Sequence, residues 1–194
     1  MDEAMTAGDP RIAAADTAIG AALTLVLAPT QVGEQSGSTS IGATITRSGA
    51  TASAVTVTLT VEEGLTAPAT VVIPAGQSSV NFRLGVVDNA IVDGSRSRTV
   101  SAEAAGLAGA SAAVTITDND VPQLAFAAAV TTIDEGYGPL TVTVTRNTAD
   151  TSAPVTVVLS NNKPYKMTVP ASVTIAAGEA SASFAVTPVN DTAV

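Results

Sequence analysis

The sequence predicts an all-β protein made of two tandem Ig-like antiparallel β-sandwich modules, the second lacking its last two strands. Two observations support this fold class. Short segments rich in Val and Thr alternate with period two between turns that contain Gly, Pro or Asp. In addition, one pattern recurs about 100 residues further along the chain, as expected for tandem copies of a domain.

The first module is expected to contain a series of short strands. "AVTVTLTV" and "AAVTITD" alternate clearly, and turn signals such as "IPAGQ" and "VDGS" separate the segments. The expected strands are 23–28, 31–33, 39–47, 54–61, 69–73, 79–87, 97–104 and 112–117. This number of short strands in a segment of about 100 residues is typical of an Ig-like sandwich. Residues 1–22 remain as an N-terminal extension, linker or donor segment, in which 9–22 could form a helix starting at Asp9 and Pro10.

The repeat defines the module boundaries. "VVIPAGQSSVNFRLGVVDNAIV" (71–92) aligns without a gap with "VTIAAGEASASFAVTPVNDTAV" (173–194), an offset of 173 − 71 = 102. The complete module therefore spans 23–120, and a partial module spans 121–194. The counterparts of the last two strands are missing, which would leave strand edges open to pairing. Either the chain is a piece of a longer protein, or another subunit completes the sandwich by strand complementation, with residues 1–22 as a candidate donor.

Composition excludes several functional classes. The chain contains no Cys and no His, so disulfides, Ser-His-Asp triads and the usual zinc sites are excluded, and we expect no enzyme activity. The net charge of −9 disfavours nucleic acid and anionic membrane surfaces as partners. The most apolar run, residues 12–28, contains Asp16 and is barely long enough to span a bilayer, so membrane insertion is not expected.

"VTITDND" (114–120) is an alternating segment that ends in three oxygen-bearing side chains. Two interpretations are open. Asp and Asn cap polar turns by accepting hydrogen bonds from nearby backbone N–H groups. They are also typical calcium ligands, because Ca²⁺ prefers six to eight oxygen donors.

Several motifs in combination resemble the Calx-beta family, which is known from sodium/calcium exchangers and bacterial surface proteins. These motifs are "TVTVTR", the "IPAG" turn, "VVDNAIVDG" and the closing "VTITDND". The resemblance covers residues 23–120 fully and 122–194 in part. It implies an Ig-like sandwich with calcium sites at one end. The positions that match the metal ligands of the family are Glu34, Asp88, Asp93, Asp118, Asn119 and Asp120.

The sequence also departs from the Calx-beta pattern. Arg96 and Arg98 occupy a stretch that is usually acidic, and Arg96 could neutralise the carboxylates without a metal ion. In the second copy only Glu135 and Asp191 match the acidic positions. The recurring strand-end arginines, Arg47 and Arg146, are expected to form surface ion pairs. The cluster "NNKPYK" (161–166), together with Tyr137, is either a contact surface or an ordinary loop.

Together these features favour an extracellular or cell-surface structural or adhesive repeat, such as a stalk, surface-protein or filament unit, with calcium as its cofactor at the module joint. Its expected partners are other copies of the same protein, neighbouring modules or an unknown surface ligand. Two alternatives remain open: a calcium-sensing regulatory module, and an accessory domain of a larger secreted enzyme.

Overall fold

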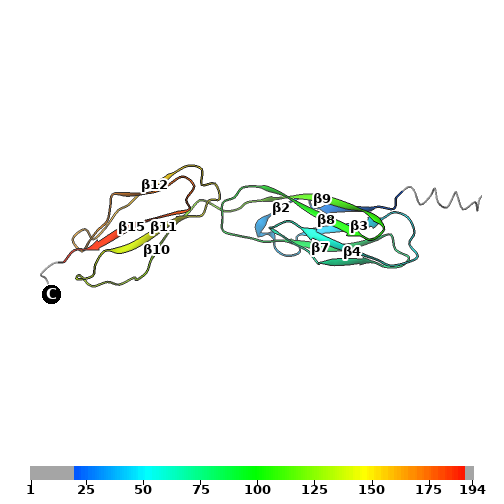
Figure 1. Cartoon of the computed structure of the whole chain (residues 1–194), viewed down its shortest axis with the longest axis horizontal. Coiled ribbons are helices and arrows are strands. Elements are labelled where there is room, and N and C mark those ends of the chain that lie inside the picture. The colour runs from blue at the N-terminus through cyan, green and yellow to red at the C-terminus, as the bar shows by residue number, and fades with distance from the viewer. Residues whose placement is uncertain (1–19, 191–194) are drawn as a thin grey trace, which may run out of the picture. The chain divides into compact units, whose positions relative to one another are not determined.

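The computed structural model describes residues 20–190, which fold almost entirely as β-strands (Figure 1). The chain forms two compact units. Among the described residues, unit 1 contains 20–89 together with Gly94–Asn119, and unit 2 contains Ala90–Asp93 together with 120–190. The prediction of tandem antiparallel β-sandwiches is confirmed. Two parts of the predicted first module, 23–120, fall in unit 2 instead. They are Asp120 and the short segment Ala90–Asp93, in which the Val92 N–H donates to the Asn147 carbonyl at 2.8 Å.

The first sheet of unit 1 has the order β1-β3-β7-β5, and all its neighbouring strands are antiparallel. Its strands are β1 (Leu23–Ala28), β3 (Ile41–Arg47), β7 (Ser79–Val86) and β5 (Leu65–Thr66). In β1, "LTLVLA", every second residue is a buried leucine, as the period of two predicts.

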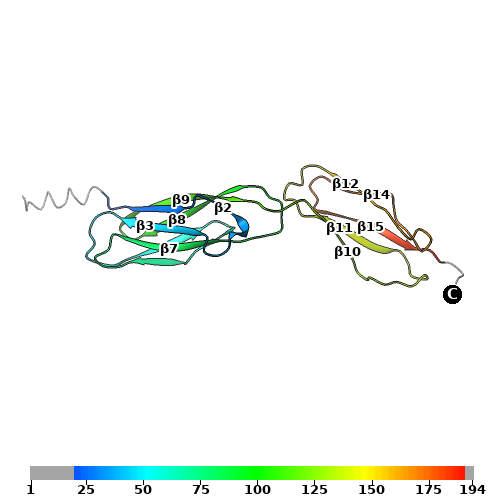
Figure 2. The same cartoon turned by 180° about the vertical axis from the view of Figure 1, so that it is seen from behind.

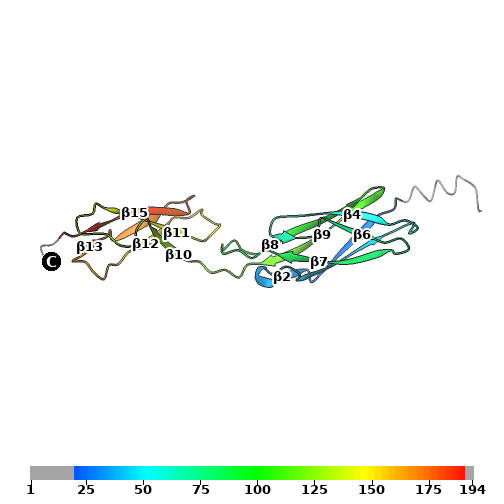
Figure 3. The same cartoon turned by 90° about the horizontal axis from the view of Figure 1, so that it is seen from below.

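The second sheet of unit 1 has the order β2-β9-β8-β4-β6 and can be followed in Figures 2 and 3. Its strands are β2 (Gln31–Gly33), β9 (Leu107–Thr117), β8 (Arg96–Ala104), β4 (Val55–Val61) and β6 (Thr70–Ile73). All its neighbours are antiparallel except β2, which pairs with β9 in parallel. This parallel pair departs from the purely antiparallel prediction, and it positions the candidate site.

The core of unit 1 lies between these two sheets and consists of aliphatic side chains. The fully buried residues include Ile41, Ile45, Val57, Leu84 and Val100. Val and Ile favour the extended backbone and pack well on a pleated surface, so a core without Trp or Tyr is compatible with a sandwich.

Unit 2 repeats part of this arrangement (Figure 2). One sheet has the order β10-β11-β15-β13, and the other contains only β12 and β14. The strands are β10 (Leu124–Ala128), β11 (Leu140–Arg146), β15 (Ser181–Pro188), β13 (Met167–Thr168), β12 (Val155–Val158) and β14 (Ser172–Ile175). Among residues 20–190, nothing corresponds to β8 and β9, as the repeat predicts. Among the described residues of this unit, the buried core cluster consists of Val144, Val157 and Ile175.

The structure differs from the predicted strands in detail. The short strand β5 and its counterpart β13 were not predicted, because two residues carry no detectable periodicity. Strand β9 begins at Leu107, five residues before the predicted strand, because its small residues pair with β8 across a two-residue turn. The possible helix at 9–22 falls mostly outside the described residues, but Ala22 makes a parallel bridge to Ala108.

The expectation that Arg47 and Arg146 form surface ion pairs is wrong. Both are buried, with 4% and 7% of their surface exposed. Arg47 donates hydrogen bonds to the backbone carbonyls of Thr51, Ser53, Pro74 and Gln77. Arg146 donates to those of Thr151, Ala153, Ala176 and Glu179, the equivalent positions of unit 2. Each arginine therefore ties together two turns at one end of its sandwich.

Candidate metal site

The parallel pairing of β2 and β9 places two carboxylates side by side. Its register sets Gly33 opposite Thr117, and each of these residues ends its strand. The next residues are Glu34, which opens the 3₁₀ turn η1 (Glu34–Ser36), and Asp118. Because the carboxyl ends of parallel strands lie at the same edge of a sheet, these two acids meet although 84 residues (118 − 34) separate them in sequence.

Asp120 completes a group of three carboxylates. One oxygen each from Glu34, Asp118 and Asp120 lies within 4.8 Å of the other two. Glu34 is almost fully buried, with 1% of its surface exposed, whereas both aspartates are half-buried. Three acids this close repel one another unless positive charge or hydrogen-bond donors compensate them.

Several donors supply part of this compensation. The Arg96 guanidinium lies 3.4 Å from Glu34, between Nη2 and Oε2. The Asn89 backbone N–H donates to the other Glu34 oxygen at 3.4 Å. The Gly94 N–H donates to Oδ2 of Asp118 at 2.7 Å. The sequence anticipated the role of Arg96, but the two backbone donors leave no signature in the sequence.

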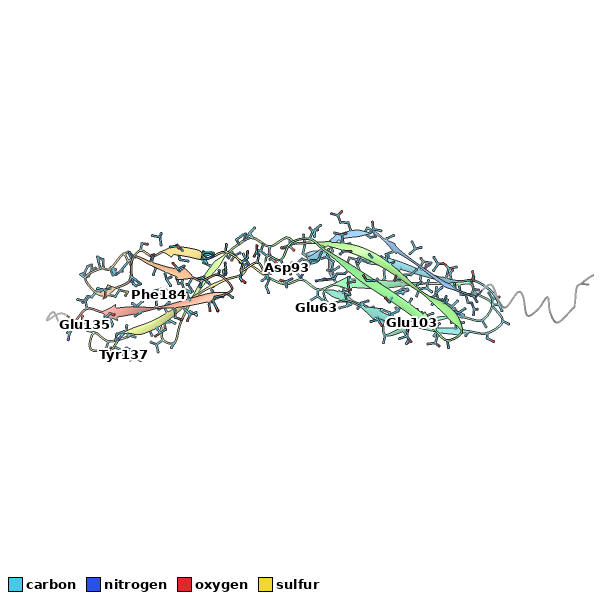
Figure 4. The ribbon with its side chains drawn as sticks, turned by 45° about the horizontal axis from the view of Figure 1, so that its top comes forward. Glu63, Asp93, Glu103, Glu135, Tyr137 and Phe184 are labelled. Carbon is cyan, nitrogen blue, oxygen red and sulfur yellow. The ribbon has the colours of Figure 1, made fainter. Side chains whose placement is uncertain are left out.

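The other predicted ligands are placed differently. Asp88 and Asn119 are exposed, and Asp93 is half-buried in the segment between β7 and β8, where Figure 4 labels it. Neither Asp88 nor Asp93 belongs to the group of acids within 4.8 Å of one another. The structure therefore brings together three of the five predicted acids, Glu34, Asp118 and Asp120. The cluster is mixed, because one of its three carboxylates, that of Glu34, pairs with a guanidinium.

Unit 2 lacks an equivalent cluster among its described residues. Glu135, which aligns with Glu34, forms an ion pair with Lys166, between Oε1 and Nζ at 2.9 Å. Figure 4 labels Glu135 and Tyr137 in this unit. Asp191, the other matching acid, lies outside the described residues. The counterpart of Glu34 in unit 2 thus pairs with a lysine, and "NNKPYK" gains a structural role that its sequence did not indicate.

The donor set of the Glu34, Asp118 and Asp120 cluster fits a hard cation. All three side chains offer carboxylate oxygens, which suit Ca²⁺ and Mg²⁺ rather than a thiophilic metal. Three carboxylates supply up to six oxygens, the lower limit of calcium coordination. The nearby Arg96 reduces the net charge of the cluster from −3 to −2, which lowers its attraction for a cation without removing it.

Comparison with known proteins gives no family assignment. No protein-family description matches the chain, and no curated protein sequence matches it. Among solved structures, the chain is similar to CBD12 from CALX1.2, with 14% identity and a TM-score of 0.40 over 88% of this chain and 77% of that chain. It is also similar to the calcium binding domain CBD12 of CALX1.1, with 21% identity and a TM-score of 0.39 over 84% and 74%.

A third similar structure is the Escherichia coli chaperone DraB, with 13% identity and a TM-score of 0.33 over 86% of each chain. These values are too low to transfer a function to this protein. Within residues 20–190, no helix is long and apolar enough to cross a bilayer.

Proposed function

We propose that this protein is a non-catalytic structural or adhesive repeat of the cell surface or extracellular space, and that Glu34, Asp118 and Asp120 bind Ca²⁺. The observation that carries the calcium proposal is the convergence of three carboxylate oxygens within 4.8 Å, one of them from a buried glutamate. Burying a charged carboxylate is unfavourable unless a partner compensates it. A divalent cation would compensate this cluster more fully than Arg96 alone.

The position of the cluster suggests how calcium would act. Asp118 and Asp120 lie in the segment between β9 and β10, which follows the last strand of unit 1. An ion bound to them and to Glu34 would fix the start of this segment to the end of β2. It would thereby restrict the chain that leads into unit 2. Such stiffening suits a stalk or filament module whose partners are further copies or neighbouring modules.

Calorimetric titration with Ca²⁺ and melting in calcium or EDTA test the proposal. We expect binding heat and a calcium-dependent rise in the melting temperature of unit 1, worth about 2.7 kcal/mol at a free concentration one hundred times Kd. Glu34→Gln should abolish both effects. The matched control is Asp88→Asn, which removes an exposed acid outside the cluster. A wild-type chain without heat or melting shift would refute calcium binding.

One observation favours calcium sensing as a second function. Because Arg96 pairs with Glu34 at 3.4 Å, a cation and the guanidinium compete for the same carboxylate. The start of β8, where Arg96 lies, would then adopt one arrangement with calcium bound and another without it. Amide hydrogen exchange in β8 distinguishes the two functions. If the protein is a calcium sensor, calcium should change the protection of amides in β8 itself. If calcium is purely structural, it should slow exchange only around Glu34 and residues 118–120.

A further inference from the structure

The segment Ala90–Asp93, called the strap below, lies on the connection between β7 and β8. It belongs to unit 2, although the residues on either side of it, Asn89 and Gly94, belong to unit 1. The chain therefore leaves unit 1 after β7, joins unit 2 for four residues and returns to form β8. Because residues of a connection lose conformational entropy when they are ordered, specific contacts must hold so short a segment in place.

Val92 provides the backbone contacts of the strap. Its N–H donates to the Asn147 carbonyl at 2.8 Å, and its own carbonyl accepts a hydrogen bond from the Ala149 N–H at 3.0 Å. These two bonds form an isolated parallel bridge between Val92 and Thr148. A single bridge stabilises a segment only weakly, since one hydrogen bond contributes a net free energy of about 1 kcal/mol.

The side chain of Asn147 adds three contacts to this bridge. Its Nδ2 donates to the carbonyl of Ala90 at 3.0 Å and to the carbonyl of Val121 at 3.1 Å. Its Oδ1 accepts a hydrogen bond from the Gln123 N–H at 2.7 Å. An amide side chain offers two N–H donors and one carbonyl acceptor, and Asn147 uses all of them on the backbone. It thereby connects the strap to the residues that precede β10.

The equivalent position of unit 1 separates two roles of Asn147. Ser48 directly follows the buried arginine of unit 1, as Asn147 follows that of unit 2. The Ala22 N–H donates to the Ser48 hydroxyl at 2.8 Å, just as the Gln123 N–H donates to Oδ1 of Asn147. A serine is therefore sufficient to accept this hydrogen bond at the strand end. The two Nδ2 donors of Asn147 serve the strap and Val121 in addition.

Both ends of the strap lead directly to the acidic cluster of the candidate metal site. The Asn89 N–H donates to Glu34 at 3.4 Å, and the Gly94 N–H donates to Asp118 at 2.7 Å. These two donors are the residues immediately before and after the strap, so holding the strap restricts both of them. Hydrogen bonds to a metal-binding carboxylate fix its orientation, and losing such a bond weakens metal binding.

We propose that Asn147 is a positioning residue for the acidic cluster. By fastening the strap in unit 2, its side chain keeps the Asn89 and Gly94 N–H groups on Glu34 and Asp118. Asn147 acts through the backbone of the strap rather than as a calcium ligand. The inference rests on the calcium binding proposed above, but the effect of Asn147 on the strap does not require calcium.

Asn147→Ser tests this role, because it keeps the acceptor that unit 1 uses and removes both Nδ2 donors. In EDTA, the amides of Asn89 and Gly94 should exchange faster than in the wild type, since the strap opens more often. Calorimetric titration should show a Kd for Ca²⁺ about tenfold higher. The matched control is Asn162→Ser, the same replacement at an exposed position of unit 2, which should change neither result.

A cross-link shows whether the effect passes through the strap. The chain contains no Cys, so Val92→Cys combined with Thr148→Cys introduces a single pair of thiols. Residues paired on neighbouring strands lie about 4.8 Å apart, which is within the range of a disulfide. Oxidising this pair in the Asn147→Ser protein should restore both the protection of Asn89 and Gly94 and the affinity for Ca²⁺.

Calcium titration of the wild type separates failure of this inference from failure of the proposed function. A wild type that binds no Ca²⁺ refutes the calcium proposal, and the positioning role with it. If the wild type binds Ca²⁺, two results overturn the positioning role alone. One is an Asn147→Ser protein with unchanged exchange at Asn89 and Gly94 or with an unchanged Kd. The other is a loss of affinity that the oxidised cross-link does not restore.

Discussion

Arg47 donates two hydrogen bonds to the backbone carbonyl of Gln77, from Nε at 3.0 Å and from Nη2 at 2.8 Å. The corresponding bonds from Arg146 to Glu179 are 3.0 and 2.6 Å. A planar guanidinium presents five donors in a fixed geometry, so one side chain can bind several carbonyls of adjacent turns. This contact between an arginine and two turns is common to both units, and it stabilises each fold from within.

Replacing Arg47 with Met should destabilise unit 1 by about 2–4 kcal/mol, because buried carbonyls lose their donors. Arg47→Lys should recover only part of this loss, since an ammonium cannot reproduce the fork geometry. Urea unfolding, monitored by the NMR signals of unit 1, measures the free energy of unfolding of both variants. Arg83→Met, at an exposed position on β7, is the control. Equal stability of the Met and wild-type proteins would contradict the assigned role.

Gly85→Ala should destabilise unit 1 by about 1–3 kcal/mol through overpacking. An added Cβ would lie 2.5 Å from Cα of Ser38, a backbone atom that cannot move aside alone. The loop that holds Ser38 also carries Glu34, so calcium affinity should fall together with stability. Melting and calcium titration measure these effects.

Gly136→Ala is the matched control, since a Cβ there meets nothing within 4 Å. Unchanged melting of Gly85→Ala would mean that the loop is not held against β7 as the structure shows.

Arg96→Met should destabilise unit 1 in EDTA by about 1–3 kcal/mol, because it leaves the buried Glu34 carboxylate without its nearby cation. Calcium should offset this loss and bind more tightly than in the wild type, since competition by the guanidinium is removed. Melting curves with and without calcium measure both effects, with Arg83→Met again as control. Weaker calcium binding by Arg96→Met would argue against competition at Glu34.

Asp150 provides a pH-dependent prediction in unit 2. Hydrogen bonds from the Ser152 hydroxyl and backbone N–H lower the pKa of Asp150 below its ordinary value of 3.8, and the Arg146 charge adds to this effect. A lowered folded-state pKa means that the stabilisation is present above the unfolded pKa and is lost as pH falls through the folded value. NMR titration of the wild type should show this lowered pKa. Ser152→Ala should raise it, and an unchanged pKa would show that the hydroxyl does not contribute.

Much of the fold follows from the sequence alone. Alternating Val and Thr residues predict nearly every strand of unit 1, because the side-chain period of a strand is local and independent of its partners. The repeat predicts the second unit, in which the described residues, up to 190, include no counterpart of β8 and β9. Sequence also identifies Glu34, Asp118 and Asp120 as candidate ligands. It groups them with Asp88 and Asp93, which the structure places outside the cluster of acids, and with Asn119, which is exposed.

Only the tertiary structure shows which of the predicted acids lie together. The parallel register of β2 and β9 sets Glu34 beside Asp118, and a three-residue strand gives no sign in the sequence of which partner it will choose. The burial of Arg47 and Arg146 is hidden for a similar reason. Their partners are backbone carbonyls, which every residue carries, so no residue type marks the acceptor. Strand identity is therefore determined by local sequence, whereas charge placement is decided by pairing between segments far apart in the chain.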